Sequence, residues 1–197
     1  MTKVKSVGMK IILGSQSRFR AQALQDAGIT IDEMMSPGID EKAIRDENPE
    51  RLVLMLAKAK AEALLPKISE PAILITADQV VMCNGEMREK PKDKAEAMGW
   101  LASYVKYTAE AVNGLQVVNT ATGKIATGID RATIIYKPTL LAKIKEIIDN
   151  SFAMEAAGAL VEENALMTPH ELRRTGEVNS FMGMPIELLK KLMAEVE

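Results

Sequence analysis

The sequence predicts an α/β fold, and three kinds of segment carry this prediction. Ala72-Ile73-Leu74-Ile75 is an apolar run that is too short for a helix and rich in β-branched residues, as in a buried strand. Residues 49–65 have the apolar spacing of an amphipathic helix. Two β-rich arms, 108–118 and 124–136, flank a polar turn and predict an antiparallel hairpin.

The first strand leads into a helix through a polar loop. Residues 9–14 (MKIILG) read as a strand, Ser17 is a good N-cap for a helix over 18–27, and Gly28 supplies its stop. This layout aims free backbone N–H groups and the positive end of a helix at an anion. It is neither a Walker loop nor a GxGxxG loop, because the required spacing is missing.

The side chains of this loop favour a phosphate ligand. Ser15 and Ser17 supply hydroxyls, and Arg18 and Arg20 lie in the first helical turn. Two cations at a helix N-terminus oppose the dipole unless an anion compensates them. We therefore prefer a phosphate site here to the alternative, a plain capped surface helix.

The next segments contain two further candidates. Residues 29–34 read as a second strand, and the adjacent acids Asp40 and Glu41 follow in a loop, where solvated charges are the common case. Asn48-Pro49 marks the start of the amphipathic helix. Lys60 lies beside its buried stripe, and position alone favours a side chain that snorkels to solvent over one that reaches inward.

The central stretch, 72–91, places an acid and a lysine on a hairpin. Asp78 follows the apolar run where we expect the strand to end, and Asn84-Gly85 is a strong hairpin turn. The returning arm carries Lys90 and stops at Pro91. The pair suits a metal–phosphate ligand, and an edge hairpin with ordinary solvated charges is the alternative.

The rest of the chain is predicted in less detail. We expect a helix over 93–104, a short helix from Thr139, a less regular stretch from Ser151 and a final helix from about Pro185. His170 is the only histidine, and its loop composition favours a surface residue over a catalytic one.

Composition restricts the class of protein. The 197 residues suffice for one large domain or two joined lobes. A net charge of −2 and 4% aromatic residues speak against binding to nucleic acid or to anionic membranes. The single Cys83 excludes an internal disulfide, and the N-terminal apolar run is too short for a signal peptide or a membrane span. We therefore expect a cytoplasmic protein.

Five segments occur in an order that resembles a known family. The segments ILGSQS…R, IDE, LAKAKA, ADQVV…EKP and AAGALVEE…MGMP resemble the Maf/septum-formation-like nucleotide pyrophosphatases, and most closely their eukaryotic branch. The resemblance runs from about Lys10 to Leu189. No single segment is very specific, but their order is.

The resemblance implies both a fold and an activity. The fold is a single domain over 1–197, with an elongated mixed sheet, flanking helices and two closely joined lobes around a cleft, similar to the inosine-triphosphatase fold. The activity is metal-dependent hydrolysis of nucleoside triphosphates, of pyrimidine or modified bases, to monophosphate and pyrophosphate. The implied role is sanitation of the nucleotide pool, usually by a homodimer.

The resemblance also implies roles for seven residues. The residues expected to bind substrate are Ser15, Ser17, Arg20, Lys60 and Lys90. Asp78 and Glu41 are expected to be catalytic and to bind the metal, Mg²⁺ or Mn²⁺, because these ions prefer oxygen ligands. We assign activation of the attacking water to Asp78, with Glu41 mainly on the metal.

Three departures from the family pattern concern substrate preference more than chemistry. Phe19-Arg20 stands where many members have consecutive arginines, which leaves Arg18 as an extra cation. Gln79 follows the acid where threonine is common, and residues 157–163 contain no clear counterpart of a glutamine found in many bacterial members.

Two other classes of function remain open on the sequence alone. A nucleotide-binding regulator of cell division without turnover would use the same residues, and release of pyrophosphate separates it from an enzyme. A nucleic-acid-binding module is the weaker alternative and would show a steep salt dependence of binding.

Overall fold

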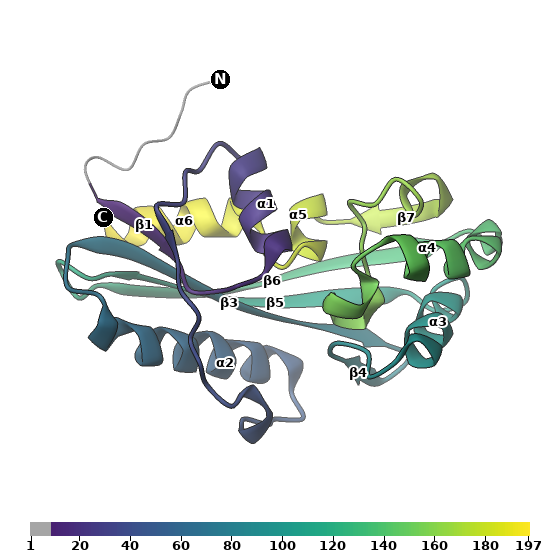
Figure 1. Ribbon diagram of the computed structural model, residues 1–197, viewed down its shortest axis with the longest axis horizontal. Coiled ribbons are helices and arrows are strands. Elements are labelled where there is room, and N and C mark those ends of the chain that lie inside the picture. Colours follow the sequence, from purple (N-terminus) through teal and green to yellow (C-terminus); the bar gives the residue numbers. More distant parts are fainter. Residues whose placement is uncertain (1–8) are drawn as a thin grey trace. The chain divides into compact units, whose positions relative to one another are not determined.

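One mixed sheet organises the computed structural model, which describes residues 9–197 (Figure 1). The strand order is β2-β1-β3-β5-β6-β7, with β4 beside β3. Strand β1 pairs in parallel with β2 and β3, whereas β4 pairs antiparallel with β3, and β7 antiparallel with β6. With helices flanking the sheet, the predicted α/β class is confirmed.

The bounds of the elements follow the chain. The strands are β1 (Lys10–Leu13), β2 (Glu33–Met34), β3 (Ala72–Cys83), β4 (Glu86–Arg88), β5 (Ala109–Asn119), β6 (Ile125–Tyr136) and β7 (Glu171–Thr175). The α-helices are α1 (Arg18–Asp26), α2 (Pro49–Leu64), α3 (Lys94–Ser103), α4 (Ile144–Asn150), α5 (Val178–Phe181) and α6 (Ile186–Val196). Short 3-10 turns include η1 (Glu41–Ala43), η3 (Pro138–Ala142), η5 (Ala157–Ala159) and η6 (Thr168–His170).

The chain divides into two compact units. The first contains the chain up to Asp78, then Asn113–Asp130 and Gly183–Glu197, and the second contains Gln79–Val112 and Arg131–Met182. Strands β3, β5 and β6 each contribute residues to both units. Residues 1–8, where the predicted domain begins, lie outside the described residues.

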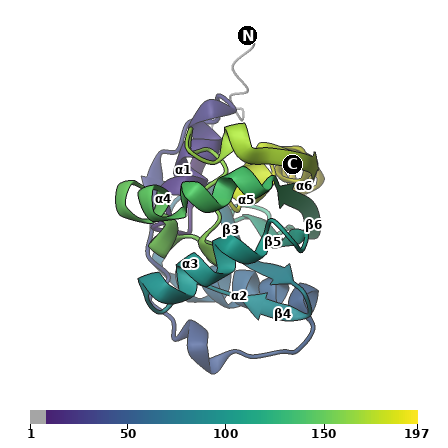
Figure 2. The ribbon, with the colours of Figure 1, turned by 90° about the vertical axis from the view of Figure 1, so that its right-hand side faces the viewer.

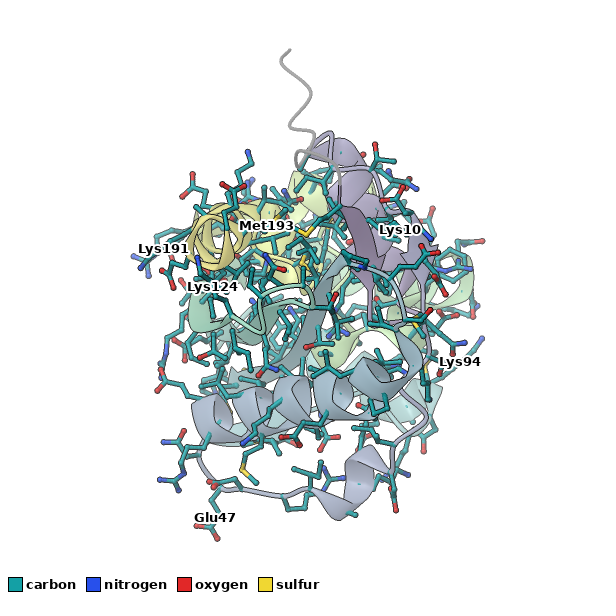
Figure 3. The ribbon with its side chains drawn as sticks, turned by 90° about the vertical axis from the view of Figure 1, so that its left-hand side faces the viewer. Lys10, Glu47, Lys94, Lys124, Lys191 and Met193 are labelled. Carbon is teal, nitrogen blue, oxygen red and sulfur yellow. The ribbon has the colours of Figure 1, made fainter. Side chains whose placement is uncertain are left out.

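In the first unit, helices cover both faces of its strands. Helix α2 lies on one face, and α1 and α6 lie on the other (Figure 1). The amphipathic character of α6 explains its orientation: Met193 is 9% exposed, whereas Lys191 points outward (Figure 3). The Asn119 side chain donates a 2.9 Å hydrogen bond to the Val196 carbonyl oxygen and so fixes the end of this helix.

In the second unit, α3 and α4 pack side by side (Figure 2). Helix α3 begins at the Asp93 cap, whose carboxylate accepts the Glu96 N–H at 2.8 Å, as its sequence predicts. None of the helices in the described residues has the length and apolar composition needed to cross a bilayer.

The structure corrects several local predictions. Strand β2 has two residues instead of the six predicted over 29–34, and the helix predicted from Thr139 is the turn η3 followed by α4. Strand β7 and helix α5 lie in the stretch from Ser151, for which no regular element was predicted. Asp78 lies within β3 and not at its end, because the buried apolar pattern continues on both sides of it.

Candidate functional site

The loop before α1 is held by its own serines. Ser17 caps the helix, its hydroxyl accepting the Arg20 N–H at 3.4 Å, as predicted. Ser15 is 6% exposed, and its hydroxyl accepts the Ser17 N–H at 3.1 Å and Arg20 Nη1 at 3.2 Å. The two hydroxyls and the first turn of α1 are therefore fixed together in the first unit.

Arg20 and Arg18 differ in environment. The Arg20 side chain turns into the first unit, where its Nε also donates a 3.2 Å hydrogen bond to the Gly183 carbonyl oxygen. Burial lowers the pKa of Arg20, and the charges of Asp78 and Glu41 raise it. Arg18 is exposed. The two carboxylates act on Arg20, which therefore belongs to the same cluster of charges.

Lys60 reaches inward and joins the two predicted carboxylates. Its side chain is 5% exposed, its Nζ lies 2.5 Å from Asp78 Oδ1, and the same Nζ lies 3.2 Å from Glu41 Oε2. The interpretation of Lys60 as a snorkelling residue was therefore wrong. A buried ammonium is stable when it is paired, and here two carboxylates share it.

The two carboxylates differ in solvent access. The Asp78 side chain is 10% exposed on β3, whereas the Glu41 side chain is 51% exposed in η1. The neighbouring Asp40 caps that turn, accepting the Lys42 N–H at 3.0 Å. Of the adjacent acids, Glu41 is therefore the one that faces Lys60.

The first-unit cluster is balanced in charge, because Arg20 and Lys60 are matched by Glu41 and Asp78. A polyanionic triphosphate bound there needs additional positive charge. Two carboxylates suffice for Mg²⁺, which is commonly held by one or two protein carboxylates, substrate phosphates and water. No group of three or more metal-ligating side chains is found among residues 9–197. The donor set therefore suits a cation brought with the substrate and not a closed protein cage.

Lys90 belongs to the second unit. It follows β4, and its side chain is exposed. The other six predicted site residues all lie in the first unit.

Two contacts near these residues were not predicted. The Gly183 carbonyl oxygen accepts the hydrogen bond from Arg20 Nε. Gly183 lies in the Met-Gly-Met-Pro segment, for which the sequence predicted no contact. In the second unit, the Gln79 amide donates a 2.7 Å hydrogen bond to the Ser180 carbonyl oxygen. Gln79 directly follows Asp78, and this adjacency was the one feature of the sequence that pointed to Gln79.

Comparisons with known proteins agree on one group. The sequence model of a protein family described as Maf-like protein matches residues 10–196. A 7-methyl-GTP pyrophosphatase of Dictyostelium discoideum is 41% identical over 94% of this chain and 96% of that one. Proteins of the same name from Vibrio vulnificus and Idiomarina loihiensis are 30% and 29% identical, over 94% and 93% of both chains respectively.

A solved structure gives a more distant likeness. The nucleoside-triphosphatase, or dITP/XTP pyrophosphatase, of Mycobacterium abscessus is matched with a TM-score of 0.39 and 14% identity, over 66% of this chain and 75% of that one.

Proposed function

This chain belongs to the Maf-like protein family, and from that membership we propose that it hydrolyses 7-methyl-GTP to 7-methyl-GMP and pyrophosphate. The name shared by the relatives supports the choice of base, since one of them is 41% identical over nearly the whole of both chains. Of the two substrate groups expected from the sequence, modified nucleotides are therefore favoured over pyrimidine nucleotides.

The observation that carries the chemistry is the buried Lys60 between Asp78 and Glu41. Cleavage between the α and β phosphates requires a positioned water, neutralised phosphate charge and a group that takes the proton from the water. The bond of Lys60 to Asp78 Oδ1 fixes the orientation of this carboxylate. We assign its other oxygen, Oδ2, as the group that takes the proton from the attacking water.

The other residues would bind the phosphates. The Ser15 and Ser17 hydroxyls accept main-chain N–H groups and keep their own hydrogens to donate, and the Arg20 guanidinium lies beside Ser15. Hydroxyl and guanidinium donors at the start of a helix favour phosphate oxygens. Lys90 is proposed as a further cation on the phosphates. When the water oxygen attacks the α-phosphorus, the bond to the β-phosphate oxygen breaks, and pyrophosphate leaves.

We further propose that activity depends on Mg²⁺ or Mn²⁺. Glu41 and Asp78 would hold the ion, which would supply neutralising charge to the phosphates. Assembly as a homodimer and a cytoplasmic location stay predictions from the sequence.

A panel of normal and modified nucleoside triphosphates, with pyrophosphate as the readout, tests the proposal. We expect the fastest release from 7-methyl-GTP with Mg²⁺, and loss of release in excess chelator. Formation of diphosphate and orthophosphate, or full turnover with chelator, would contradict it. A pyrimidine triphosphate as the best substrate would contradict the assigned base alone.

The variant Asp78→Asn tests the assignment of Asp78 as the base catalyst. It keeps the size of the side chain and removes the proton acceptor, so turnover should fall by roughly a hundredfold to ten-thousandfold. Binding of 7-methyl-GTP should survive. Thermal stability should fall in either case, because Asp78 pairs with the buried Lys60. If Asp78 has only a structural role, the variant keeps its activity per folded molecule, and Glu41 becomes the residue to test.

A further inference from the structure

The segment that carries Lys90 is connected to two distant parts of the second unit. The Glu89 carbonyl oxygen, directly before Lys90, accepts the Gly158 N–H at 2.9 Å. The Gly158 carbonyl oxygen in turn accepts the Tyr104 hydroxyl at 2.7 Å. Gly158 therefore links Tyr104, at the end of α3, to the main chain beside Lys90.

Tyr104 is well placed to act as a fixed point. Its side chain is fully buried, and burial raises the pKa of its hydroxyl, so that the hydroxyl is a hydrogen-bond donor at neutral pH. Helix α3 also packs against η5, the turn that contains Gly158. The packing of α3 against η5 and the hydrogen bond to Gly158 therefore both hold the Tyr104 side chain in place.

The turn at Gly158 is packed too closely for a residue with a side chain. Gly158 has φ +61°, and a Cβ there would lie 2.6 Å from the Tyr104 hydroxyl oxygen and 2.8 Å from Val81 Cβ. The next residue, Ala159, also has a positive φ, +57°, which is uncommon for a residue with a side chain. Glycine adopts such a φ at little cost, but Ala159 persists in it only where surrounding contacts hold the turn.

Arg88 anchors the same segment from the other side of Glu89. Its guanidinium lies over the Trp100 and Tyr104 rings, at 5.6 and 5.1 Å from their centroids. Its Nη1 donates to the Ser103 hydroxyl at 2.8 Å, and its Nε donates to Glu86 at 2.8 Å. The two residues before Lys90 are therefore both fixed, one by its side chain and one by its main chain.

We propose that Tyr104 is a positioning residue for Lys90: through Gly158 and Glu89 it fixes the main chain that carries this lysine. Lys90 is a flexible side chain, so a fixed main chain lowers the entropy that binding costs. The inference rests on the proposed function, because it assumes that Lys90 contacts substrate.

A double-mutant cycle separates positioning from stability. With 7-methyl-GTP and Mg²⁺, Lys90→Ala should lower kcat/KM about tenfold to hundredfold, and Tyr104→Phe about threefold to tenfold. If Tyr104 acts through Lys90, then Tyr104→Phe should change kcat/KM little in the Lys90→Ala background. Equal factors in both backgrounds would overturn the proposal, because a merely structural tyrosine would act without Lys90.

Two further variants keep the test decisive. Tyr107→Phe removes a phenol hydroxyl three residues away, from a ring that lies 5.1 Å from Lys106 Nζ, and should leave kcat/KM unchanged. If Tyr104→Phe does not fold, Arg88→Lys replaces it in the cycle, since it keeps the charge and loses the forked contacts with Glu86 and Ser103.

Equilibrium binding of 7-methyl-GTP to the same proteins repeats the cycle without turnover. A wild-type protein that binds but releases no pyrophosphate would overturn the proposed function, while coupling between Tyr104 and Lys90 in affinity would still support the positioning role. A wild-type protein that neither binds nor hydrolyses 7-methyl-GTP would overturn both.

Discussion

Lys60 shows how one side chain organises the first-unit cluster. It lies on α2, and it joins Asp78 of β3 to Glu41 of η1. Removal of one member of a buried charge pair leaves the other without compensation, which is more costly than the loss of a surface ion pair. Lys60 is therefore both a structural residue and a candidate for phosphate binding.

The two arginines of the first turn of α1 provide a residue-scale prediction. Arg20→Ala removes a cation that is bound to Ser15 and Gly183, and we expect kcat/KM for 7-methyl-GTP to fall about tenfold to hundredfold. Arg18→Ala removes an exposed charge, and a fall of no more than about fivefold is expected. Steady-state kinetics of the two variants measures both losses. Equal losses would show that the assignment across Phe19 is wrong.

At the scale of elements, helix α2, which carries Lys60, packs closely against β5. Gly114 of β5 permits this approach. A Cβ at this position would lie 2.6 Å from the Val53 carbonyl carbon and 2.8 Å from the Leu54 nitrogen, both in the main chain of α2. Because main-chain atoms cannot turn aside as a side chain can, any added atom must displace the helix.

We therefore expect Gly114→Ala to lower the free energy of unfolding by about 1–3 kcal/mol, as overpacking does. It should also lower kcat/KM, because a displaced α2 carries Lys60 with it. Denaturant unfolding and kinetics of the same sample provide the measurement. Gly99→Ala in α3 is the matched control, since its Cβ would meet nothing within 4 Å and should be neutral or stabilising. Unchanged activity in a destabilised Gly114→Ala would contradict the link from α2 to Lys60.

At the scale of the whole molecule, the chain passes between the two units after Asp78, Val112, Asp130 and Met182. Two of these points adjoin contacts described above. Asp78 binds Lys60 in the first unit, and Gly183, the residue after Met182, binds Arg20 there. Candidate site residues are therefore covalently next to the connections between the units.

The stability of the protein should also depend on pH through Glu162. This residue is 2% exposed, and its carboxylate accepts the Tyr136 hydroxyl. The pKa of Glu162 is raised from 4.5 to about 7, mainly by burial and also by Glu171, and this net value includes the opposing effects of Tyr136 and Arg174. Since the folded state holds this proton more tightly than the unfolded state, the contribution is fully present below about pH 4.5. It is lost as the pH rises toward 7, by at most about 1.4 kcal/mol per pH unit.

The variant Glu162→Gln keeps an acceptor for Tyr136 and removes the titration. We expect its free energy of unfolding to fall less than that of the wild type between pH 4.5 and pH 7, measured by denaturant unfolding at several pH values. Glu47→Gln, at an exposed position (Figure 3), is the control and should follow the wild type. A Glu162→Gln profile that is parallel to the wild type would contradict the raised pKa.

The sequence by itself determined the elements whose ends carry local signals. Ser17 and Gly28 bound α1, Asn48-Pro49 starts α2, and Asn84-Gly85 turns β3 into β4. Each signal acts within a few residues, through a cap, a fixed φ or a permitted positive φ. For this reason the local sequence is enough to assign most of the candidate residues to their elements.

Only the tertiary structure decided which of these residues meet. Lys60 and Asp78 are 18 residues apart, Arg20 and Gly183 are 163 apart, and Tyr104 and Gly158 are 54 apart. A periodic pattern shows which face of a helix is apolar, but it does not show whether a lysine beside that face finds a partner. Lys60 points inward because β3 and η1 bring two carboxylates to it, and burial without them would be too costly.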